Sequence, residues 1–346
     1  KHFRFDTRVT AARYDEAKRQ WAVTTDAGDT VTARFLICCT GMLSAPLTST
    51  FPGQETFKGP IFHTARWPKE PVQLAGKRVG VVGTGATGIQ VIQTIASQVG
   101  HMKVFLRTPQ YIIPMRNPKY GDSDRAAQKE GFHDMRKRVQ GTFAGFDYDF
   151  AGDSFYNMTP EARRELMEKV WADGSLSFWL TLYPEMFTDQ KVNDEVSEFV
   201  REKMRERIKD PVLAEKLIPT SYGFGTHRVP LESNYLEVYH QPNVEIVDAA
   251  IREVREQSLV TADGREHPCD VLIYGTGFTA TDFLAPMRIR GLDGLELNQA
   301  WKEGAEAYKG ISVSGFPNLF ILYGPNTNLG HNSIIYMLES QFRYVL

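Results

Sequence analysis

The sequence of 346 residues predicts an α/β fold with two parallel-sheet domains, each split along the chain, and a helical insertion. Three features support this prediction. Residues 77–107 have the pattern of a strand, a glycine-rich turn, a helix and a second strand. A set of short strands that ends in Thr-Gly occurs twice, once towards each end of the chain. Between these copies, residues 120–218 carry the spacing of amphipathic helices.

The first copy occupies residues 3–44, where short strands alternate with turns. Asp26-Ala27-Gly28 separates two alternating stretches and predicts a hairpin. The apolar run FLICC predicts a short buried strand that ends at Thr40-Gly41, with Cys38 and Cys39 inert in its core. The five prolines of residues 45–76 then indicate a connector that runs over the surface.

The strand, turn, helix and strand of residues 77–107 form one unit. KRVGVVG predicts a buried strand, GTGATG a tight turn, and KVFLR a second strand parallel to the first. The intervening segment IQVIQTIASQVG predicts a helix, because its apolar residues recur on one face: Ile89, Ile92, Ile95 and Val99.

Residues 120–218 predict several helices. Thr159 is expected to cap the first, with Pro160 in its first turn and Gly174 after its end. A second amphipathic helix spans Val192 to Ile208, and Asp210-Pro211 starts a third. This region contains no catalytic spacing, so we expect a helical insertion that shapes a cleft.

Residues 243–278 repeat the order of the opening strands. Asp26 lies 14 positions before Thr40, and Asp263 lies 13 positions before Thr276. The second copy has a glycine turn upstream, so a corresponding turn for the first copy is expected before Lys1. We therefore expect this sequence to be part of a protein that binds two nucleotides.

The composition excludes several functional classes. Lys and Arg number 40 and Asp and Glu 42, a formal net charge of −2, which argues against nucleic acid or an anionic membrane as the main partner. The three cysteines form no C-x-x-C pair, so neither a disulfide scaffold nor a metal site is expected. No apolar run reaches the ~18 residues of a membrane span. We expect a cytoplasmic protein.

The glycine turn is the first candidate binding site. Gly83, Gly85 and Gly88 form G-x-G-x-x-G directly between a predicted strand and helix. This arrangement is typical of Rossmann-like dinucleotide-binding domains, in which the helix N-terminus binds a pyrophosphate. A structural turn without a ligand is the alternative. The expected contacts are Gly83, Thr84, Gly85, Ala86, Thr87, Gly88 and Gln90.

The end of the second strand predicts which nucleotide binds. NAD-binding domains usually place Asp or Glu there, about 20 residues after the turn, on the ribose 2′-hydroxyl. Here the position is occupied by Arg107, nineteen residues after Gly88, followed by Thr108. A guanidinium attracts a 2′-phosphate, so these residues favour NADPH over NADH. A solvated arginine at a strand end is the alternative.

The string FKGPIFHTARWP places Phe57, Gly59, His63, Trp67 and Pro68 in the spacing F-x-G-x-x-x-H-x-x-x-W-P. This spacing resembles the fingerprint of the type I Baeyer–Villiger monooxygenases, class B flavoproteins that carry FAD and NADPH. The related flavin-containing monooxygenases resemble it at Phe, Gly and His but usually lack Trp-Pro. The resemblance therefore implies the Baeyer–Villiger family.

The resemblance extends across nearly the whole chain. CTGMLSAP and YGTGF resemble the segments that enter the family's FAD domain, and FPNLFILYGPNTNLGHNS resembles its flavin-side C-terminal segment. The family's first glycine turn and its second fingerprint are expected before Lys1. The FAD contacts implied by the resemblance are Thr40, Gly41, Thr276, Gly277, Phe278, Asn326 and Asn332.

GTHRVP resembles the segment that holds the family's active-site arginine, which falls on Arg228. A fixed guanidinium stabilises developing oxyanions, so Arg228 is the first candidate catalytic residue, with a surface arginine as the alternative. The preceding residue is often Lys in the family but is His227 here, which weakens the expected 2′-phosphate contact. His63 is the second candidate, either a hydrogen-bonding residue of the connector or a general acid/base. His331 either faces the flavin or caps the next helix together with Asn332 and Ser333.

The implied activity is insertion of one oxygen atom of O2 next to the carbonyl of a ketone or aldehyde, through a flavin C4a-peroxide. The implied FAD domain covers residues 1–68 and 276–346, and the NADPH domain covers 69–115 and 222–275 around a helical insertion over 116–221. Three alternatives stay open: an S- or N-oxygenating flavin-containing monooxygenase, a non-catalytic nucleotide-binding fragment, and a flavin-dependent disulfide reductase, which the cysteine spacing disfavours.

Overall fold

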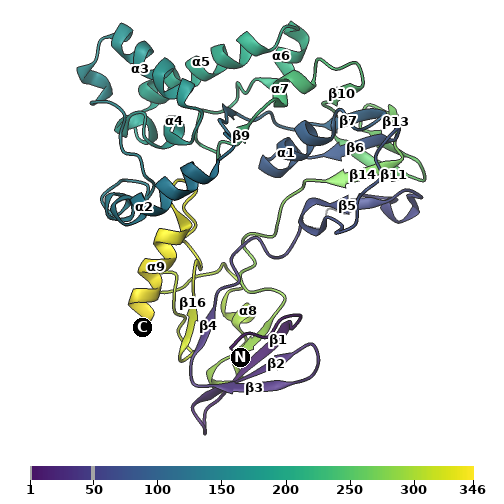
Figure 1. The fold of residues 1–346 in the computed structure, drawn as a ribbon. Helices are drawn as coiled ribbons and strands as arrows, with labels where there is room; N and C mark the ends of the chain where they lie inside the picture. The colour runs from purple at the N-terminus through teal and green to yellow at the C-terminus, as the bar shows by residue number, and fades with distance from the viewer. Residues whose placement is uncertain (1, 48–50) are drawn as a thin grey trace. The chain divides into compact units, whose positions relative to one another are not determined.

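The computed structural model describes residues 2–47 and 51–346, and the chain divides into two compact units (Figure 1). The terminal unit consists of the residues up to Leu47 and those from Gly277 to Leu346. The central unit consists of the residues between them. Within the described ranges, no helix combines the length and the apolar character needed to cross a membrane.

The central unit is built on a parallel sheet of five strands in the order β10-β7-β6-β14-β5. From β6 the chain crosses over to β7 on one side, whereas β14 pairs with β6 on the other side, so the strand order reverses at β6. Such a reversal at the carboxyl ends of the strands is where nucleotides bind in this class of sheet. The strands are β5 (Ile61–His63), β6 (Arg78–Val82), β7 (His101–Phe105), β10 (Val244–Val247) and β14 (Val271–Tyr274).

The predicted strand, turn, helix and strand are confirmed as β6, the turn, α1 (Ala86–Ile95) and β7. The buried face of α1 contains Ile89, Ile92 and Ile95, because residues three and four apart share one side of a helix. The helix ends earlier than the apolar spacing indicates, since Val99 is buried beyond its end.

The repeated set of strands is also confirmed. In the central unit, an antiparallel meander of three strands precedes the parallel strand β14. In the terminal unit, an equivalent meander precedes β4, which pairs in parallel with β16. The strand β15 pairs in parallel with β1 at the edge of this meander. The strands are β11 (Ile251–Arg255), β12 (Ser258–Thr261), β13 (Glu266–Pro268), β1 (Val9–Asp15), β2 (Gln20–Thr25), β3 (Thr30–Ala33), β4 (Leu36–Cys38), β15 (Arg288–Arg290) and β16 (Leu319–Ile321).

The three predicted helices of the insertion are present, and polar caps start each one. Thr159 accepts a hydrogen bond from the Ala162 N–H at the start of α3, and Asp189 and Asp210 cap α5 and α6 in the same way. The remaining elements of the central unit are short except for α2. The helices and strands of this region are α2 (Asp122–Val139), α3 (Pro160–Asp173), α4 (Ser177–Leu180), α5 (Gln190–Arg207), α6 (Pro211–Leu217), α7 (Tyr235–Val238), β8 (Ile113–Pro114) and β9 (Leu231–Glu232).

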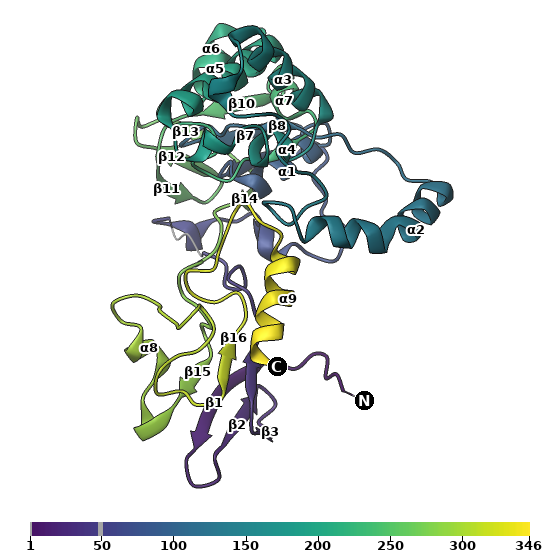
Figure 2. The ribbon, with the colours of Figure 1, turned by 90° about the vertical axis from the view of Figure 1, so that its left-hand side faces the viewer.

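The insertion shares one hydrophobic core with the parallel sheet. Val81 of β6, Ile92 of α1 and Val200 of α5 belong to the same buried cluster. Figure 2 shows α2 projecting from this body, and all its residues are exposed or half-buried. The terminal unit adds α8 (Leu297–Ala300) and α9 (Ile334–Val345), and short 3-10 helices occur at Gln54–Thr56, Thr64–Arg66, Phe155–Asn157, Pro184–Phe187 and Leu292–Gly294.

Two details of the sequence analysis need correction. Cys39 is exposed, although Cys38 is buried, because Cys39 follows the end of β4 and successive side chains on an extended chain point to opposite faces. The connector is not merely a surface segment, since β5 lies within it and pairs with β14. The two compact units divide after Leu47 and after Thr276.

Candidate functional site

The carboxyl edge of the central sheet collects most of the predicted site residues. His63 is the last residue of β5, Gly83 follows β6, and Arg107 and Thr276 lie two residues beyond the ends of β7 and β14. Because the strands are parallel, these four positions come to the same edge of the sheet. The sequence analysis therefore selected residues from four separate segments that the fold brings to one edge.

The three glycines of the turn have different steric surroundings. Gly83 has a φ of +100°, and a Cβ there would lie 2.6 Å from the Gly275 carbonyl oxygen. A Cβ on Gly88 would lie 2.2 Å from the Gly83 carbonyl oxygen, so this glycine allows α1 to pack closely against the turn. A Cβ on Gly85, in contrast, would have no described atom within 4 Å. The surface over Gly85 is thus open to a ligand.

The N-terminus of α1 has the character of an anion site. Gly85 is its N-cap residue and has no side chain to satisfy the first N–H groups of the helix. Ala86 and Thr87 begin the helix, and Thr87 and Gln90 are exposed. Thr84 is buried instead, and its Oγ1 lies 3.5 Å from the Thr108 carbonyl oxygen, which connects the turn to the segment after β7.

Arg107 is exposed and makes no hydrogen bond or ion pair with any residue in the described ranges. An exposed guanidinium without a partner is available to a phosphate, which it can bind through two parallel hydrogen bonds. The residues at this edge therefore fit a dinucleotide with an additional phosphate group: open backbone N–H groups at Gly85 and a cation after the neighbouring strand.

His63 is held by contacts on both ring nitrogens. Its Nδ1 accepts a hydrogen bond from the Ala65 N–H at 3.1 Å, so the ring hydrogen belongs on Nε2. Nε2 lies 3.3 Å from Thr276 Oγ1, which can accept that hydrogen. His63 thus links the ends of β5 and β14 next to Gly277, where the chain enters the terminal unit. Trp67 packs at a tilt on Phe62 with 5.7 Å between the ring centroids.

His227 and Arg228 lie on the loop that follows α6. Both side chains are exposed, and Arg228 makes neither a hydrogen bond nor an ion pair with the part of the chain that the structure describes. The His227 ring stacks on the Tyr222 ring with centroids 4.6 Å apart. The Tyr222 hydroxyl donates to the Pro109 carbonyl at 2.7 Å, two residues after Arg107. The loop that carries His227 and Arg228, the arginine loop, therefore contacts the segment after β7 through Tyr222.

The glycines of the two Thr-Gly segments, Gly41 and Gly277, both lie in the terminal unit, and both have a positive φ. Gly41 has a φ of +65° and Gly277 a φ of +90°, and a Cβ on either would meet no described atom within 4 Å. The chain after each segment runs beside the other, because the Leu47 N–H donates to the Gly277 carbonyl and Phe278 bridges to Pro46. Thr40 and Gly41 follow β4 as Thr276 and Gly277 follow β14.

The C-terminal loop of the terminal unit has unusual polar features. Asn326 adopts a left-handed φ of +62°, which costs free energy in a residue other than glycine and is concentrated at functional sites. The Oδ1 atoms of Asn328 and Asn332 are buried without a hydrogen-bond partner in the described structure. Such atoms fit a ligand that donates hydrogen bonds. Sequence reasoning selected Asn326 and Asn332 but missed Asn328. Ser333, one of the residues expected to cap the last helix, caps α9.

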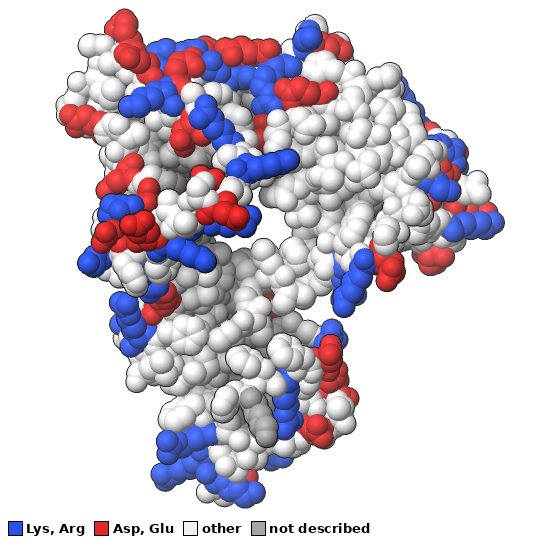
Figure 3. Space-filling model, viewed as in Figure 1, with Lys and Arg blue, Asp and Glu red and all other residues white. Residues whose placement is uncertain are grey.

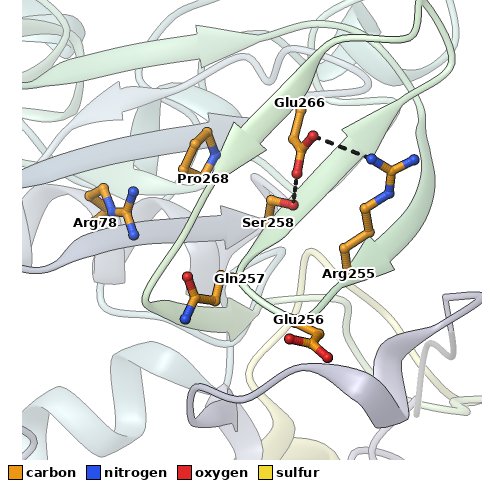
Figure 4. A pocket seen from close by; sticks show the side chains of 7 residues that line it. All are labelled: Arg78, Arg255, Glu256, Gln257, Ser258, Glu266 and Pro268. Carbon is orange, nitrogen blue, oxygen red and sulfur yellow. Dashed lines mark hydrogen bonds and ion pairs between the residues drawn. The ribbon is translucent and has the colours of Figure 1, made fainter.

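A shallow pocket of the central unit lies away from this edge (Figure 4). It is lined by Arg78, at the amino end of β6, and by residues of the β11-β12-β13 meander, including the hydrogen-bonded pair Ser258 and Glu266. The carboxyl edge of the sheet is at the opposite end of β6. Acidic and basic side chains are mixed over the helices in Figure 3, and no group of three metal-ligating side chains occurs among the described residues.

Comparisons with known proteins show which proteins this chain is similar to. Residues 1–119 match the family model described as Flavin-binding monooxygenase-like. The chain is 52% identical over 318 residues to the acetone monooxygenase (methyl acetate-forming) of Gordonia sp. (strain TY-5), an alignment that covers 91% of this chain and 60% of that protein. It is 35% identical to the cyclohexanone 1,2-monooxygenase of Acinetobacter sp., covering 100% of this chain and 64% of that protein.

Solved structures give the same result. The crystal structure of OTEMO complexed with FAD and NADP matches with a TM-score of 0.94 and 38% identity, over 99% of this chain and 65% of that one. The open crystal structure of cyclohexanone monooxygenase matches with a TM-score of 0.90 and 35% identity, over 99% of this chain and 67% of that one. The chain thus spans about 60% of the length of the curated relatives it matches. On these grounds, the chain belongs to the type I Baeyer–Villiger monooxygenases.

Proposed function

We propose that this chain acts in an FAD- and NADPH-dependent monooxygenase that converts a ketone into an ester or lactone. The observation that carries the proposal is the carboxyl edge of the central sheet, where open backbone at Gly85 and the unpartnered guanidinium of Arg107 occur together. These two features match the pyrophosphate and the 2′-phosphate of NADPH, respectively. The activities of relatives whose alignments cover 91% and 100% of the chain support the same assignment.

In this proposal the central unit binds NADPH. The residues that would hold the pyrophosphate are those of the turn and the first turn of α1, with Thr108 beside them. Arg107 and His227 would contact the 2′-phosphate, because one is a cation at the strand end and the other is a protonatable ring on the adjoining loop. NADP bound to the related OTEMO supports this choice of nucleotide.

The terminal unit would hold FAD. Thr40 with Gly41 and Gly277 with Phe278 would contact it, since a Cβ on either glycine would meet no described atom within 4 Å. Asn326 would contact the cofactor by backbone or side chain, and the Asn332 amide has an acceptor that still needs a donor. When both cofactors are bound, NADPH supplies the hydride and the reduced flavin supplies the means to activate O2.

The roles of the remaining candidates follow from charge and geometry. Addition of an oxygen nucleophile to a carbonyl generates an oxyanion, and the Arg228 guanidinium would stabilise that charge. His63 would act by holding Thr276 at the end of β14 rather than by transferring a proton, because its Nδ1 already accepts from a backbone N–H. Thr276 begins the passage into the terminal unit, so this contact would set the course of that segment.

The substrate is proposed to be a small ketone, since the relative with 52% identity is an acetone monooxygenase that forms methyl acetate. N-oxygenation is a second candidate, because a phenazine N-monooxygenase of Lysobacter antibioticus is 32% identical over 100% of the chain. A thioether would report S-oxygenation in the same way. These reactions use the same cofactors, so the product distinguishes them.

The test is product analysis with the FAD-loaded enzyme, NADPH and O2. Acetone, cyclohexanone, phenazine and a thioether are supplied separately, and ester, lactone, N-oxide and sulfoxide are quantified against NADPH consumed. The proposal expects methyl acetate from acetone at a higher kcat/KM than any product from phenazine. N-oxide without ester would overturn it in favour of N-oxygenation. A purified protein with neither flavin absorbance nor NADP+ binding would instead be a non-catalytic fragment.

A further inference from the structure

The backbone of Phe224 is bound by two side chains that lie one helical turn apart on α5. The Asn193 Nδ2 donates to the Phe224 carbonyl at 2.8 Å, and the Phe224 N–H donates to Ser197 Oγ at 2.8 Å. Ser197 Oγ also donates to Asn193 Oδ1 at 3.2 Å. Ser197 and Phe224 are both only 1% exposed, so water does not compete for these hydrogen bonds.

The glycines on either side of Phe224 allow this close contact. A Cβ on Gly223 would lie 2.2 Å from Asn193 Oδ1. Gly225 has a φ of +78°, and a Cβ there would lie 2.6 Å from the Trp179 Nε1 of α4. The segment Gly-Phe-Gly is therefore seated on α4 and α5, and it leads directly into Thr226, His227 and Arg228.

A second set of contacts joins this segment to the chain after β7. The Tyr222 hydroxyl donates to the Pro109 carbonyl at 2.7 Å, and the Tyr111 hydroxyl donates to the Tyr222 carbonyl at 3.1 Å. The two rings meet edge to face with centroids 5.3 Å apart. Tyr111 is 2% exposed and also packs on Phe224. The two segments therefore hold each other, and one of them carries Arg107.

We propose that Asn193, Ser197, Tyr111 and Tyr222 are positioning residues, which hold His227 and Arg228 at a fixed place beside Arg107. The helical insertion then has a defined role, because side chains of α5 bind the backbone at the start of the arginine loop. This inference rests on the proposed function, because it assigns the loop to NADP recognition and to oxygen transfer. The four residues themselves contact neither substrate nor nucleotide in the proposal.

The test compares Asn193→Ala and Tyr222→Phe with two matched controls. Asn243→Ala removes another amide that binds backbone carbonyls, those of Ala96 and Val99, but Asn243 lies at the amino edge of the sheet. Tyr183→Phe removes a buried tyrosine hydroxyl that donates to the Arg163 carbonyl within the insertion. The controls therefore lose comparable hydrogen bonds without touching the arginine loop.

The first measurement is calorimetric binding of NADP+ and NAD+. Loss of one hydrogen bond that orders the loop is expected to weaken NADP+ binding roughly five- to tenfold in Asn193→Ala and in Tyr222→Phe. NAD+ binding is expected to change about twofold or less, since it lacks the 2′-phosphate. The controls are expected to bind both nucleotides as the wild type does, even where their melting temperatures fall equally.

The second measurement is the fraction of NADPH consumption that yields ester in the FAD-loaded enzyme. Asn193→Ala is expected to lower this fraction in the wild-type background but not further in an Arg228→Ala background, because it acts through the loop. Equal effects of the test and control variants on nucleotide selectivity, or additive losses with Arg228→Ala, would overturn the inference alone. A wild-type protein that does not bind NADP+ would overturn the proposed function, and the inference with it.

Discussion

At the scale of single residues, we propose that Arg107 distinguishes NADPH from NADH by its charge. Its guanidinium is exposed and has no partner in the described structure, so its replacement removes no stabilising contact within the protein. Arg107→Ala is expected to raise the KM for NADPH at least tenfold, about 1.4 kcal/mol, while the KM for NADH changes little. Steady-state kinetics with both nucleotides measure this difference.

An exposed arginine elsewhere in the central unit provides the control. Arg252 lies on β11 of the meander and forms an ion pair with Glu253. Arg252→Ala is expected to leave both KM values unchanged. Equal losses for NADPH and NADH in Arg107→Ala would show that this residue does not recognise the 2′-phosphate.

The glycine turn makes a second prediction, because its residues separate folding from binding. Gly88→Ala is expected to destabilise the protein by about 1–3 kcal/mol, since the added Cβ would lie 2.2 Å from the Gly83 carbonyl oxygen. Gly85→Ala is expected to fold normally, because its φ of −72° suits alanine and the space above it is open, but to bind NADP+ less tightly. Thermal melts and calorimetry on both variants separate the two effects. Normal NADP+ binding by Gly85→Ala would contradict the placement of the pyrophosphate.

The sequence could predict the residues whose structural role depends only on neighbouring positions along the chain. Gly83 and Gly88 follow from the sterics of a strand-to-helix turn, and Thr159 from the unpaired N–H groups of α3. Asn193, Ser197 and Asn328 could not be predicted, because their role depends on backbone groups more than 20 residues away or on orphaned acceptors. Only the packing of α5 against the loop reveals what Asn193 binds.

At the scale of elements, the meander of the central unit is joined to the sheet by a buried histidine. Lys103 Nζ of β7 lies 3.4 Å from His267 Nδ1, and His267 Nε2 lies 3.0 Å from Thr261 Oγ1. Lys103 can only donate, so Nδ1 accepts and Nε2 carries the hydrogen. Burial of the ring, together with the positive charge of Lys103, lowers the pKa of His267 from its ordinary value of 6.5.

This arrangement predicts a pH-dependent stability. The folded pKa of His267 is below the unfolded pKa, so the unfolded state binds more protons as the pH falls below about 6.5. Stability is therefore expected to be complete above that pH and to decrease as the pH falls towards the folded pKa. Glu245 and Asp263 face the ring and oppose the shift, whereas Arg265 adds to it. Melting temperatures of wild type and His267→Gln between pH 7.5 and 5.5 measure the effect, and identical slopes would contradict it.

The elements that sequence patterns predict well are those with a single periodicity. The face of α5 that contains Val192, Val196 and Val200 is buried as the spacing indicates. The strand β5 could not be predicted, because its three residues lie among prolines and are half-buried at the edge of the sheet. Its pairing with β14, 208 or more residues away along the chain, is what orders it.

At the scale of the whole molecule, the repeat of meander and parallel strand predicts that two related units exist. Cofactor assignment depends on what each copy adds to that common pattern. The central unit adds a complete glycine turn and α1 at the end of β6. The terminal unit adds the strained loop around Asn326 and the buried acceptors of Asn328 and Asn332. We propose that the same strand pattern supports two different binding surfaces. The boundary between the units follows from strand pairing rather than from composition.

In the proposed function both units bind a nucleotide cofactor, and replacement of Arg228 tests whether the enzyme transfers oxygen to a carbonyl. Ester formation develops an oxyanion on the ketone, whereas oxygenation of a thioether creates no tetrahedral oxyanion on its substrate. Removal of one fixed donor to such an anion costs on the order of 3–4 kcal/mol, or 10²–10³ in rate. Arg228→Ala is therefore expected to lose ester formation by that factor, while thioether oxidation falls less and NADPH consumption persists.

Product yields with both substrates, normalised to NADPH consumed, measure this selective loss in the FAD-loaded enzyme. Arg255→Ala is the matched control, because Arg255 lies in the same unit and lines the pocket beside Arg78, at the amino end of β6. A uniform loss of both products in Arg228→Ala would assign the residue to binding of a cofactor instead, since a missing cofactor slows every reaction equally. An undiminished ester yield would show that Arg228 takes no part in the reaction. The contacts of α5 with the loop would then not position a catalytic group.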